Sequence, residues 1–307
     1  YEAVRRGPGG FEQRVCLKRI LPTFVGEDDF VRMFLREARL SALLHHGHIA
    51  QVLDFGIIDG THYLTLELVD GTDLRAALLH LRRRGRALDP ALASYVAFAL
   101  GAALDFAHAA DEHGNATGII HRDISPSNVL LSRAGEVKLA DFGIAKAINH
   151  PGSIQSRALK GKIPYMAPEY ALGQRCSARS DLFSLGVLLY ECVAGFRPFD
   201  GEHDLQTLDR ARNGRRQPLQ EAAPNAPATL VDAIEPLLAP EPGDRPRDAA
   251  AFLEALSPAH ASPLARRKLG ALVRAVDALD AAPSAPGLAS TRPAPTLRPR
   301  KRLPSRA

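Results

Sequence analysis

The 307-residue sequence predicts an α+β fold with two lobes, a small strand-rich lobe followed by a larger helical lobe. Two observations lead to this prediction. Strand patterns and tight-turn signals dominate the first 70 residues, and helical periodicity dominates the chain from there to about residue 257. The composition, with 46% hydrophobic and 24% charged residues, is that of a globular protein and excludes a chain that is disordered throughout.

The first lobe, residues 1–70, is predicted to contain several strands and one helix. Residues 11–20 have a strand pattern, and Glu27–Leu44 has the acidic start and the 3.6-residue apolar period of an amphipathic helix. Two further strands are predicted over residues 49–59 and 62–70. Asp59-Gly60 supplies the hairpin turn between these two strands.

The second lobe, residues 71–257, is predicted to be mainly helical. Its first helix falls over residues 72–85, and two short strands over 128–132 and 136–141 flank a turn at Ala134-Gly135. The remaining helices are predicted at about 180–195, 203–213, 228–239 and 246–256.

Residues 258–307 are rich in Ala, Pro, Ser and Arg and are predicted to be a largely disordered tail, with one helix at Leu264–Ala281. From Arg292 onward there are six basic residues and no acidic one, so without them the net charge of +5 becomes about −1. The basic character therefore belongs to the tail, and we expect no specific nucleic-acid binding by the folded part.

The sequence favours a cytoplasmic protein. The longest strongly apolar stretch, Leu182–Gly195, is too short to cross a bilayer and is interrupted by polar residues, so no transmembrane segment is predicted. Cys16, Cys176 and Cys192 lack metal-binding spacing and cannot all pair, which indicates a reducing compartment.

Five short motifs follow one another with compatible spacings. The octet HRDISPSN supplies Asp123 and Asn128, and a DFG tripeptide follows with Asp141. Carboxylate and amide oxygens on neighbouring loops are ligands that suit Mg²⁺. Upstream, Lys18 lies in a predicted strand and Glu37 on the amphipathic helix, where an ion pair would fix the lysine against nucleotide phosphates, and MAPE follows at residues 166–169.

With these motifs in this order, residues 1–257 resemble the protein kinase family, particularly the bacterial serine/threonine kinases of eukaryotic (Hanks) type. The resemblance implies a protein-kinase-like fold, ATP and Mg²⁺ as cofactors, and protein substrates. It implies that Lys18 pairs with the phosphates and with Glu37, that Asp123 is the catalytic base, and that Asn128 and Asp141 hold Mg²⁺.

The resemblance also implies an adenine site and structural braces. Leu66 takes the gatekeeper place, Glu67–Val69 form the hinge, and Asp73 contacts ribose or substrate. Cys16 replaces a small alanine over the adenine ring, where a thiol acts as a small hydrophobe. Residues named for structural roles are His121 as a packed brace, Asp181, and Arg245 as the partner of Glu169.

The sequence departs from the family at its start. No G-x-G-x-x-G precedes Lys18, and the glycines of RRGPGGF lie where the family turns between its second and third strands. Because residues 1–3 resemble the strand after the glycine loop, we expect an N-terminally truncated kinase. A chain that starts at Tyr1 is then expected to bind ATP less well than one extended upstream.

A second departure concerns Ser125 and Lys162. Related kinases carry a lysine at the first place and a threonine at the second, so hydroxyl and ammonium are exchanged here. One hypothesis is that Lys162 reaches back to supply the positive charge while the Ser125 hydroxyl hydrogen-bonds near Asp123. The alternative is that both positions have drifted and Lys162 points to water.

The sequence is also compatible with two rival functions. A pseudokinase that senses nucleotide or acts as a scaffold is the main rival, and a small-molecule kinase of related fold is the second. Ser153 and Ser156 are candidate phosphorylation sites in the activation segment, with Arg122 as a candidate phosphate ligand, although a polar loop would have the same sequence. Substrate, upstream signal and oligomeric state are not indicated.

Overall fold

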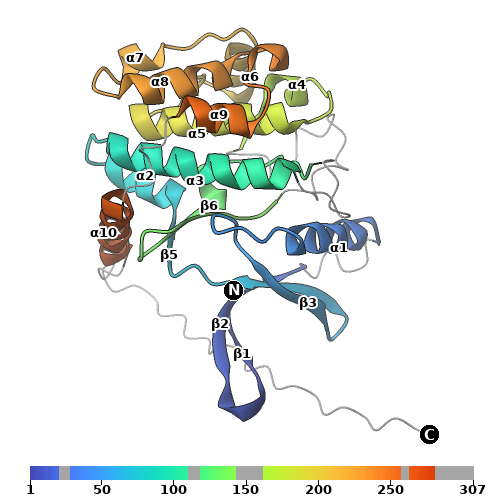
Figure 1. Cartoon of the computed structure of the whole chain (residues 1–307). Coiled ribbons are helices and arrows are strands. Elements are labelled where there is room, and N and C mark those ends of the chain that lie inside the picture. The colour runs from blue at the N-terminus through green and yellow to red at the C-terminus, as the bar shows by residue number, and fades with distance from the viewer. Residues whose placement is uncertain (21–27, 110–117, 143–161, 257–262, 281–307) are drawn as a thin grey trace, which may run out of the picture.

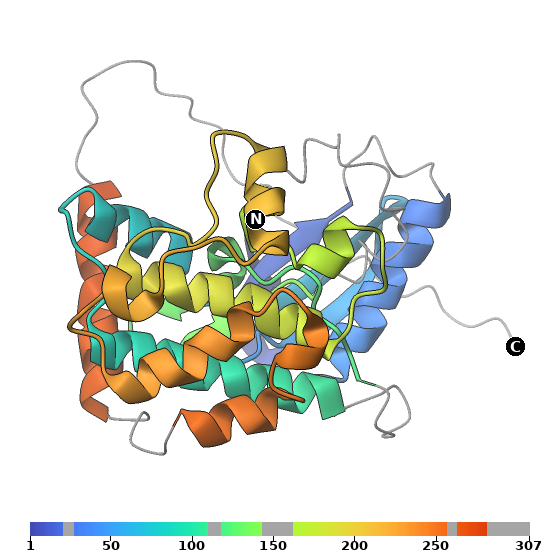
Figure 2. The same ribbon diagram turned by 90° about the horizontal axis from the view of Figure 1, so that it is seen from above.

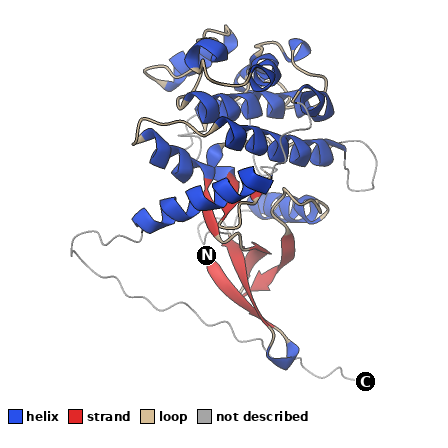
Figure 3. Cartoon of the chain, turned by 60° about the vertical axis from the view of Figure 1, so that its left-hand side comes forward, coloured by secondary structure: helices blue, strands red, loops and turns tan. Residues whose placement is uncertain are grey.

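The structure is a computed structural model that describes residues 1–20, 28–109, 118–142, 162–256 and 263–280. Strands gather in one lobe, and helices form the larger lobe beside it (Figures 1 and 3). The two-lobed α+β fold predicted from the sequence is therefore confirmed.

The N-lobe contains a four-stranded antiparallel sheet in the order β1-β2-β4-β3. Its strands are β1 (Glu2–Arg6), β2 (Glu12–Arg19), β3 (Val52–Ile58) and β4 (Thr61–Glu67). The predicted hairpin turn between β3 and β4 is present, with positive φ angles of 49° at Asp59 and 74° at Gly60. Local turn chemistry thus fixes the register of this hairpin.

One helix covers the N-lobe sheet and completes a small core. Helix α1 (Asp28–Ala42) contributes Phe34 and Ala38 to this core, and the sheet contributes Val52, Leu64 and Leu66. Cys16 packs against the edge of the same core.

A second, three-stranded sheet joins the lobes. Its strands are β5 (Gly71–Asp73), β6 (Val129–Ser132) and β7 (Val137–Leu139), in the order β5-β6-β7. The chain after α1 adds to this sheet, because the N–H of Ala50 donates to the carbonyl of Leu139 at 2.9 Å and the N–H of Leu139 donates to that of His48 at 2.8 Å. The N-lobe is thereby hydrogen-bonded to β7, the strand that Asp141 follows.

The C-lobe is built around two long apolar helices, α3 (Pro90–Ala109) and α5 (Ala178–Ala194). Around them lie shorter helices: α2 (Leu74–Arg82), α4 (Pro168–Ala171), α6 (Asp204–Arg212), α7 (Leu219–Ala222), α8 (Ala228–Ile234) and α9 (Ala249–Ala255). Among the described residues, α3 alone is long and apolar enough to cross a membrane by length and composition. Two thirds of that window, 67%, is buried inside the C-lobe, as expected of a core helix.

Two predicted helices are shorter in the structure, for identifiable reasons. The helix predicted over 228–239 ends as α8 at Ile234, where a 3₁₀ turn (Glu235–Leu238) containing Pro236 follows, because proline cannot continue the α-helical hydrogen bonding. The helix predicted over 246–256 begins at Ala249, because the Asp248 carboxylate caps it by accepting the Ala251 N–H at 2.8 Å.

Helix α10 (Pro263–Asp280) lies within the segment that the sequence assigns to a tail, and it is packed against the C-lobe. It lies on the side of the molecule opposite α1 (Figures 1 and 2). Its apolar side, Ala265, Leu269, Val273 and Val276, is buried as part of the main C-lobe core. The other residues of segment 258–307 lie outside the described residues.

Polar contacts hold α10 at the turn between β6 and β7. The Arg133 guanidinium bonds to Asp277 of α10 at 2.7 Å and to Asp70, near the end of the hinge, at 3.0 Å. Gly270 allows this close approach, since a Cβ there would lie 2.5 Å from the Arg133 carbonyl oxygen. The folded C-lobe therefore includes α10.

We predict that Leu269→Ala lowers the free energy of unfolding by about 2 to 5 kcal/mol, because it leaves a cavity under α10. Leu264→Ala on the same helix is the matched control, since that side chain is 59% exposed, and it should change stability by less than about 0.5 kcal/mol. Denaturant unfolding measures both. Equal, small effects of the two substitutions would mean that α10 is not packed in solution.

Candidate active site

The carboxylate of Asp181, on α5, holds the loop that carries the candidate base. Its two oxygens accept the backbone N–H groups of His121, at 2.7 Å, and of Arg122, at 2.8 Å. The side chain is buried and also pairs with His108 at 2.9 Å. Arg122 has a φ angle of 63°, a left-handed conformation that a non-glycine residue adopts only under such constraint.

The ring of His121 is a structural brace, as the sequence predicts. It is fully buried and packs against Phe142 with ring centroids 4.5 Å apart. Nδ1 accepts the Asp123 N–H at 3.2 Å, so Nε2 carries the proton and donates to the carbonyl of Ala140 at 3.1 Å. Burial lowers the pKa of His121, which favours the neutral ring.

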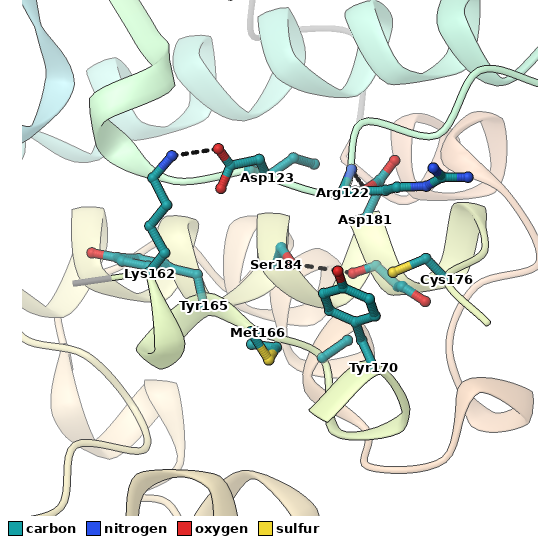
Figure 4. A pocket seen from close by; sticks show the side chains of 12 residues that line it. Arg122, Asp123, Lys162, Tyr165, Met166, Tyr170, Cys176, Asp181 and Ser184 are labelled. Carbon is teal, nitrogen blue, oxygen red and sulfur yellow. Dashed lines mark hydrogen bonds and ion pairs between the residues drawn. The ribbon is translucent and has the colours of Figure 1, made fainter. Parts of the chain in front are cut away.

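Asp123 is oriented by two side chains that donate to its Oδ2 atom. The Asn128 amide donates to Oδ2 at 3.0 Å and to the Asp123 carbonyl at 2.7 Å. The Lys162 ammonium forms an ion pair with the same carboxylate oxygen, and its side chain extends toward Asp123 in Figure 4. The structure thus brings Lys162 to Asp123, although these two residues lie on separate loops.

Ser125 does not make the predicted hydrogen bond near Asp123. Its side chain is buried, only 2% of the residue is exposed, and its hydroxyl has no partner among the described residues. The donors that the structure places at the Asp123 carboxylate are Asn128 and Lys162. Of the two contacts in the predicted exchange, the structure contains the one between Lys162 and Asp123 and lacks the one of Ser125.

The nucleotide side of the site joins the two lobes. Lys18 lies in β2, and its ammonium is 3.1 Å from Oδ1 of Asp141, which follows β7. Glu37 lies in α1, but its side chain is outside the described residues, so its pairing with Lys18 stays a prediction. Asp141 also has a left-handed φ angle, of 58°.

The predicted hinge residues connect strands of both lobes. Cys16 and Leu66 are opposite each other in neighbouring strands β2 and β4. The Glu67 carboxylate accepts the ammonium of Lys138 in β7 at 2.7 Å and the N–H of Gln51 at 2.8 Å. These contacts fix the Glu67 side chain at the junction of the two lobes.

Asp73, predicted to contact ribose or substrate, has a structural function in this structure. Its Oδ1 accepts the N–H of Ala76 at 2.8 Å and so caps the start of α2.

The donor atoms at Asn128 and Asp141 fit a divalent cation of the Mg²⁺ type. Because the Asn128 amide nitrogen donates to Asp123, its oxygen is the atom left for a ligand, and Asp141 adds carboxylate oxygens. Within the described ranges there is no group of three or more His, Cys, Asp or Glu residues that could hold a metal ion. Two protein oxygens are nevertheless typical of Mg²⁺, which keeps water and substrate phosphates in its shell.

A buried ion pair anchors the end of the segment that carries Lys162. Arg245 binds Glu169 through two nitrogens, each at 2.8 Å, and stacks its guanidinium 4.8 Å from the ring centroid of Phe183. Burial alone would raise the pKa of Glu169, but hydrogen bonds from Arg245 and Ser180 outweigh it and lower that pKa. The predicted pairing of these two residues is present.

Two cavities adjoin this site. The cavity in Figure 4, between Asp123, Lys162 and Tyr170, has about 30 Å³ of space, enough for about one water molecule. A larger cavity of about 290 Å³ borders Ser125 and Lys162 and is lined by several arginines of α2 and its neighbours. The sequence analysis missed these arginines, which are Arg75, Arg82, Arg86 and Arg197.

Ser153 and Ser156, the candidate phosphorylation sites, lie outside the described residues, as do all residues from 143 to 161.

Comparisons with known proteins agree on the family. The family model "Protein kinase domain" matches residues 10–256. "Tyrosine-protein kinase MasK" of Myxococcus xanthus is 39% identical over 251 residues, which are 81% of this chain and 39% of that protein. "Serine/threonine-protein kinase PknA" of Mycobacterium tuberculosis is 37% identical over 250 residues, 80% of this chain and 55% of that protein. The chain thus matches about two fifths to half of the length of these relatives.

The kinase domain of PknI from Mycobacterium tuberculosis is a similar solved structure. It has a TM-score of 0.59 and 29% sequence identity, covering 83% of this chain and 89% of that one. The resemblance on which the sequence analysis relies is therefore confirmed by the family model, by relatives and by fold.

We predict that Arg245→Ala lowers the free energy of unfolding by about 3 to 5 kcal/mol, because it leaves the Glu169 carboxylate buried without its partner. Arg247→Ala is the matched control, because the pair of Arg247 with Asp248 is exposed and should contribute less than about 1 kcal/mol. Chemical unfolding of the three proteins checks this. A similar small loss in both variants would contradict a stabilising role for the buried pair.

Proposed function

This chain belongs to the protein kinase family, and from that premise we propose that it transfers the γ-phosphoryl group of ATP to serine or threonine hydroxyls of proteins. The observation that carries the proposal is the set of contacts at Asp123. Its carboxylate is held by Asn128 and Lys162. The loop that carries it is hydrogen-bonded to the Asp181 carboxylate. A carboxylate held in this way can orient an acceptor hydroxyl and take its proton.

On this proposal the residues of the two lobes have different functions in catalysis. Lys18, in the N-lobe, would bind the phosphates of ATP, and the hinge backbone at Glu67–Val69 would bind the adenine beside Cys16 and Leu66. Asn128 and Asp141 would hold Mg²⁺. The cation would neutralise charge on the phosphates. Catalysis then depends mainly on positioning and on charge neutralisation.

Lys162 is proposed as a further catalytic residue. Its ammonium lies at Asp123, where the acceptor hydroxyl and the transferred phosphoryl group would meet, so it can stabilise the charge that develops there. It would thus supply the charge that a lysine at position 125 supplies in related kinases, while Ser125 keeps a neutral hydroxyl at that place.

The choice of acceptor is supported by the names of relatives, which are not unanimous. PknA and several further relatives are named serine/threonine kinases, whereas MasK is named a tyrosine kinase. The kinase unit on this proposal comprises the N-lobe, residues 1–70, and the C-lobe, residues 71–257, with α10 packed on it. Use of ATP and the three free cysteines support a cytoplasmic location.

We predict that Asp123→Asn reduces Mg²⁺-dependent phosphotransfer from ATP to protein by about 10²- to 10⁴-fold, because the general base is lost. Asp232→Asn, an exposed aspartate on α8, is the matched control and should retain activity. Peptides that differ only in carrying Ser, Thr or Tyr at the acceptor position identify the hydroxyl. Nucleotide binding without any turnover in the unaltered chain would identify a pseudokinase.

A double-mutant cycle tests the exchange between Ser125 and Lys162. We expect Lys162→Thr alone to lower kcat by about 10²- to 10³-fold, the usual effect of removing one such charge stabiliser. If the charge can be supplied from either loop, Ser125→Lys combined with Lys162→Thr should be more active than Lys162→Thr alone. Strictly additive effects on kcat would contradict the exchange.

A further inference from the structure

The cavity of about 290 Å³ next to the catalytic loop is formed by four parts of the chain. These are α2 with the residues that follow it, the catalytic loop at residues 125–127, the C-terminal end of α5 with Arg197, and the short segment that carries Lys162 and Tyr165. At this volume, just below the range of pockets for whole small ligands, it has room for one or two side chains. It also borders Lys162, so a group bound in it lies beside the acceptor site at Asp123.

The charges on the cavity wall are mostly positive. Arg75, Arg82, Arg86, Arg197 and Lys162 line it, and Glu191 is its one carboxylate. Burial raises the pKa of Glu191 and so disfavours its ionised form.

Existing partners neutralise only part of this positive charge. Lys162 is paired with Asp123, and Arg197 with Asp200 at 2.8 Å. Arg75, Arg82 and Arg86 are exposed, and the structure shows no ion pair or side-chain hydrogen bond for any of them within the described ranges. Three guanidinium groups with unused donors therefore line a single cavity.

The catalytic loop adds a neutral donor to the same wall. Ser125 lines the cavity, and its hydroxyl is buried without a partner among the described residues. A buried hydroxyl that makes no hydrogen bond is destabilising, and an anion placed in the cavity offers it an acceptor.

We propose that this cavity binds an anionic side chain of the protein substrate, a carboxylate or a phosphorylated residue, that flanks the acceptor hydroxyl in the sequence. The proposal rests on the proposed kinase function. Guanidinium groups suit both ligands because they bind carboxylate and phosphate in a planar, two-pronged geometry. A substrate segment, and not a separate small anion, is favoured because the cavity adjoins the place where the acceptor is held.

Peptide phosphorylation by the full chain tests the charge preference. The probes are peptides with one acceptor serine and otherwise neutral residues, in which the positions on each side of the acceptor carry Ala, Glu, phosphoserine or Lys. We expect kcat/KM for the Glu or phosphoserine peptide to exceed that for the Ala peptide by about tenfold or more, and the Lys peptide to be poorest. The better of the first two distinguishes a carboxylate from a phosphate as the natural ligand.

A matched pair of charge reversals tests the location. Arg82→Glu with Arg86→Glu alters the cavity, whereas Arg83→Glu with Arg84→Glu makes the same change in net charge at residues that do not line it. The first variant should lose the preference for anionic over Ala peptide and improve with the Lys peptide. The second should keep the preference of the unaltered chain, and thermal melting confirms that both variants are folded.

Equal kcat/KM for the Ala, Glu and phosphoserine peptides would overturn the cavity proposal and leave the kinase function intact. Loss of the preference for anionic over Ala peptide in both charge-reversal variants alike would have the same consequence. Absence of transfer to every peptide and protein would instead overturn the proposed function. In that case, peptide binding measured by fluorescence anisotropy of labelled peptides tests the cavity proposal. Tight binding of the anionic peptide that the first variant loses supports the cavity, and no binding overturns it.

Discussion

The buried carboxylate of Asp181 is the constraint on which the geometry of the site depends. An aspartate in the core is stable only when its oxygens are hydrogen-bonded, and here they accept two successive backbone N–H groups and pair with His108. Arg122, whose N–H donates to one of these oxygens, has a left-handed conformation. The next residue is Asp123, so the backbone that carries the candidate base is held by a carboxylate from a different segment, helix α5.

Local features of the sequence predict the fold well, because short-range chemistry determines them. The Asp59-Gly60 turn depends on two adjacent residues, and within the loop from His121 to Asn128 the Asn128 amide contacts Asp123 only five residues away. The contacts that could not be predicted in detail join distant segments. The packing of α10 depends on Gly135 and Gly270 allowing two backbones to approach, which no periodicity reveals. The arginine-lined cavity likewise needs α2, the catalytic loop and the end of α5 to be placed together.

The site residues show the same difference between features that the sequence predicts and contacts that only the fold reveals. The motifs and their spacing predicted Asp123, Asn128 and Asp141 as site residues, and the structure places Lys18 against Asp141. The predicted hydrogen bond of Ser125 near Asp123 is absent, whereas the contact of Lys162 with Asp123 is present. Lys162 was identified by aligning a motif, and only the fold could show that its side chain reaches the base.

Desolvation explains why the ammonium would be on Lys162 and the hydroxyl on Ser125. Position 125 is buried, with only 2% of the residue exposed, whereas the Lys162 side chain keeps 30% of its surface in contact with solvent. A cation is less costly to hold at the more exposed of the two positions. The small serine also leaves space at the wall of the arginine-lined cavity, where a lysine would fill part of it. On the proposed function, a single exchange of residue types would serve both the charge at Asp123 and the room for a substrate side chain.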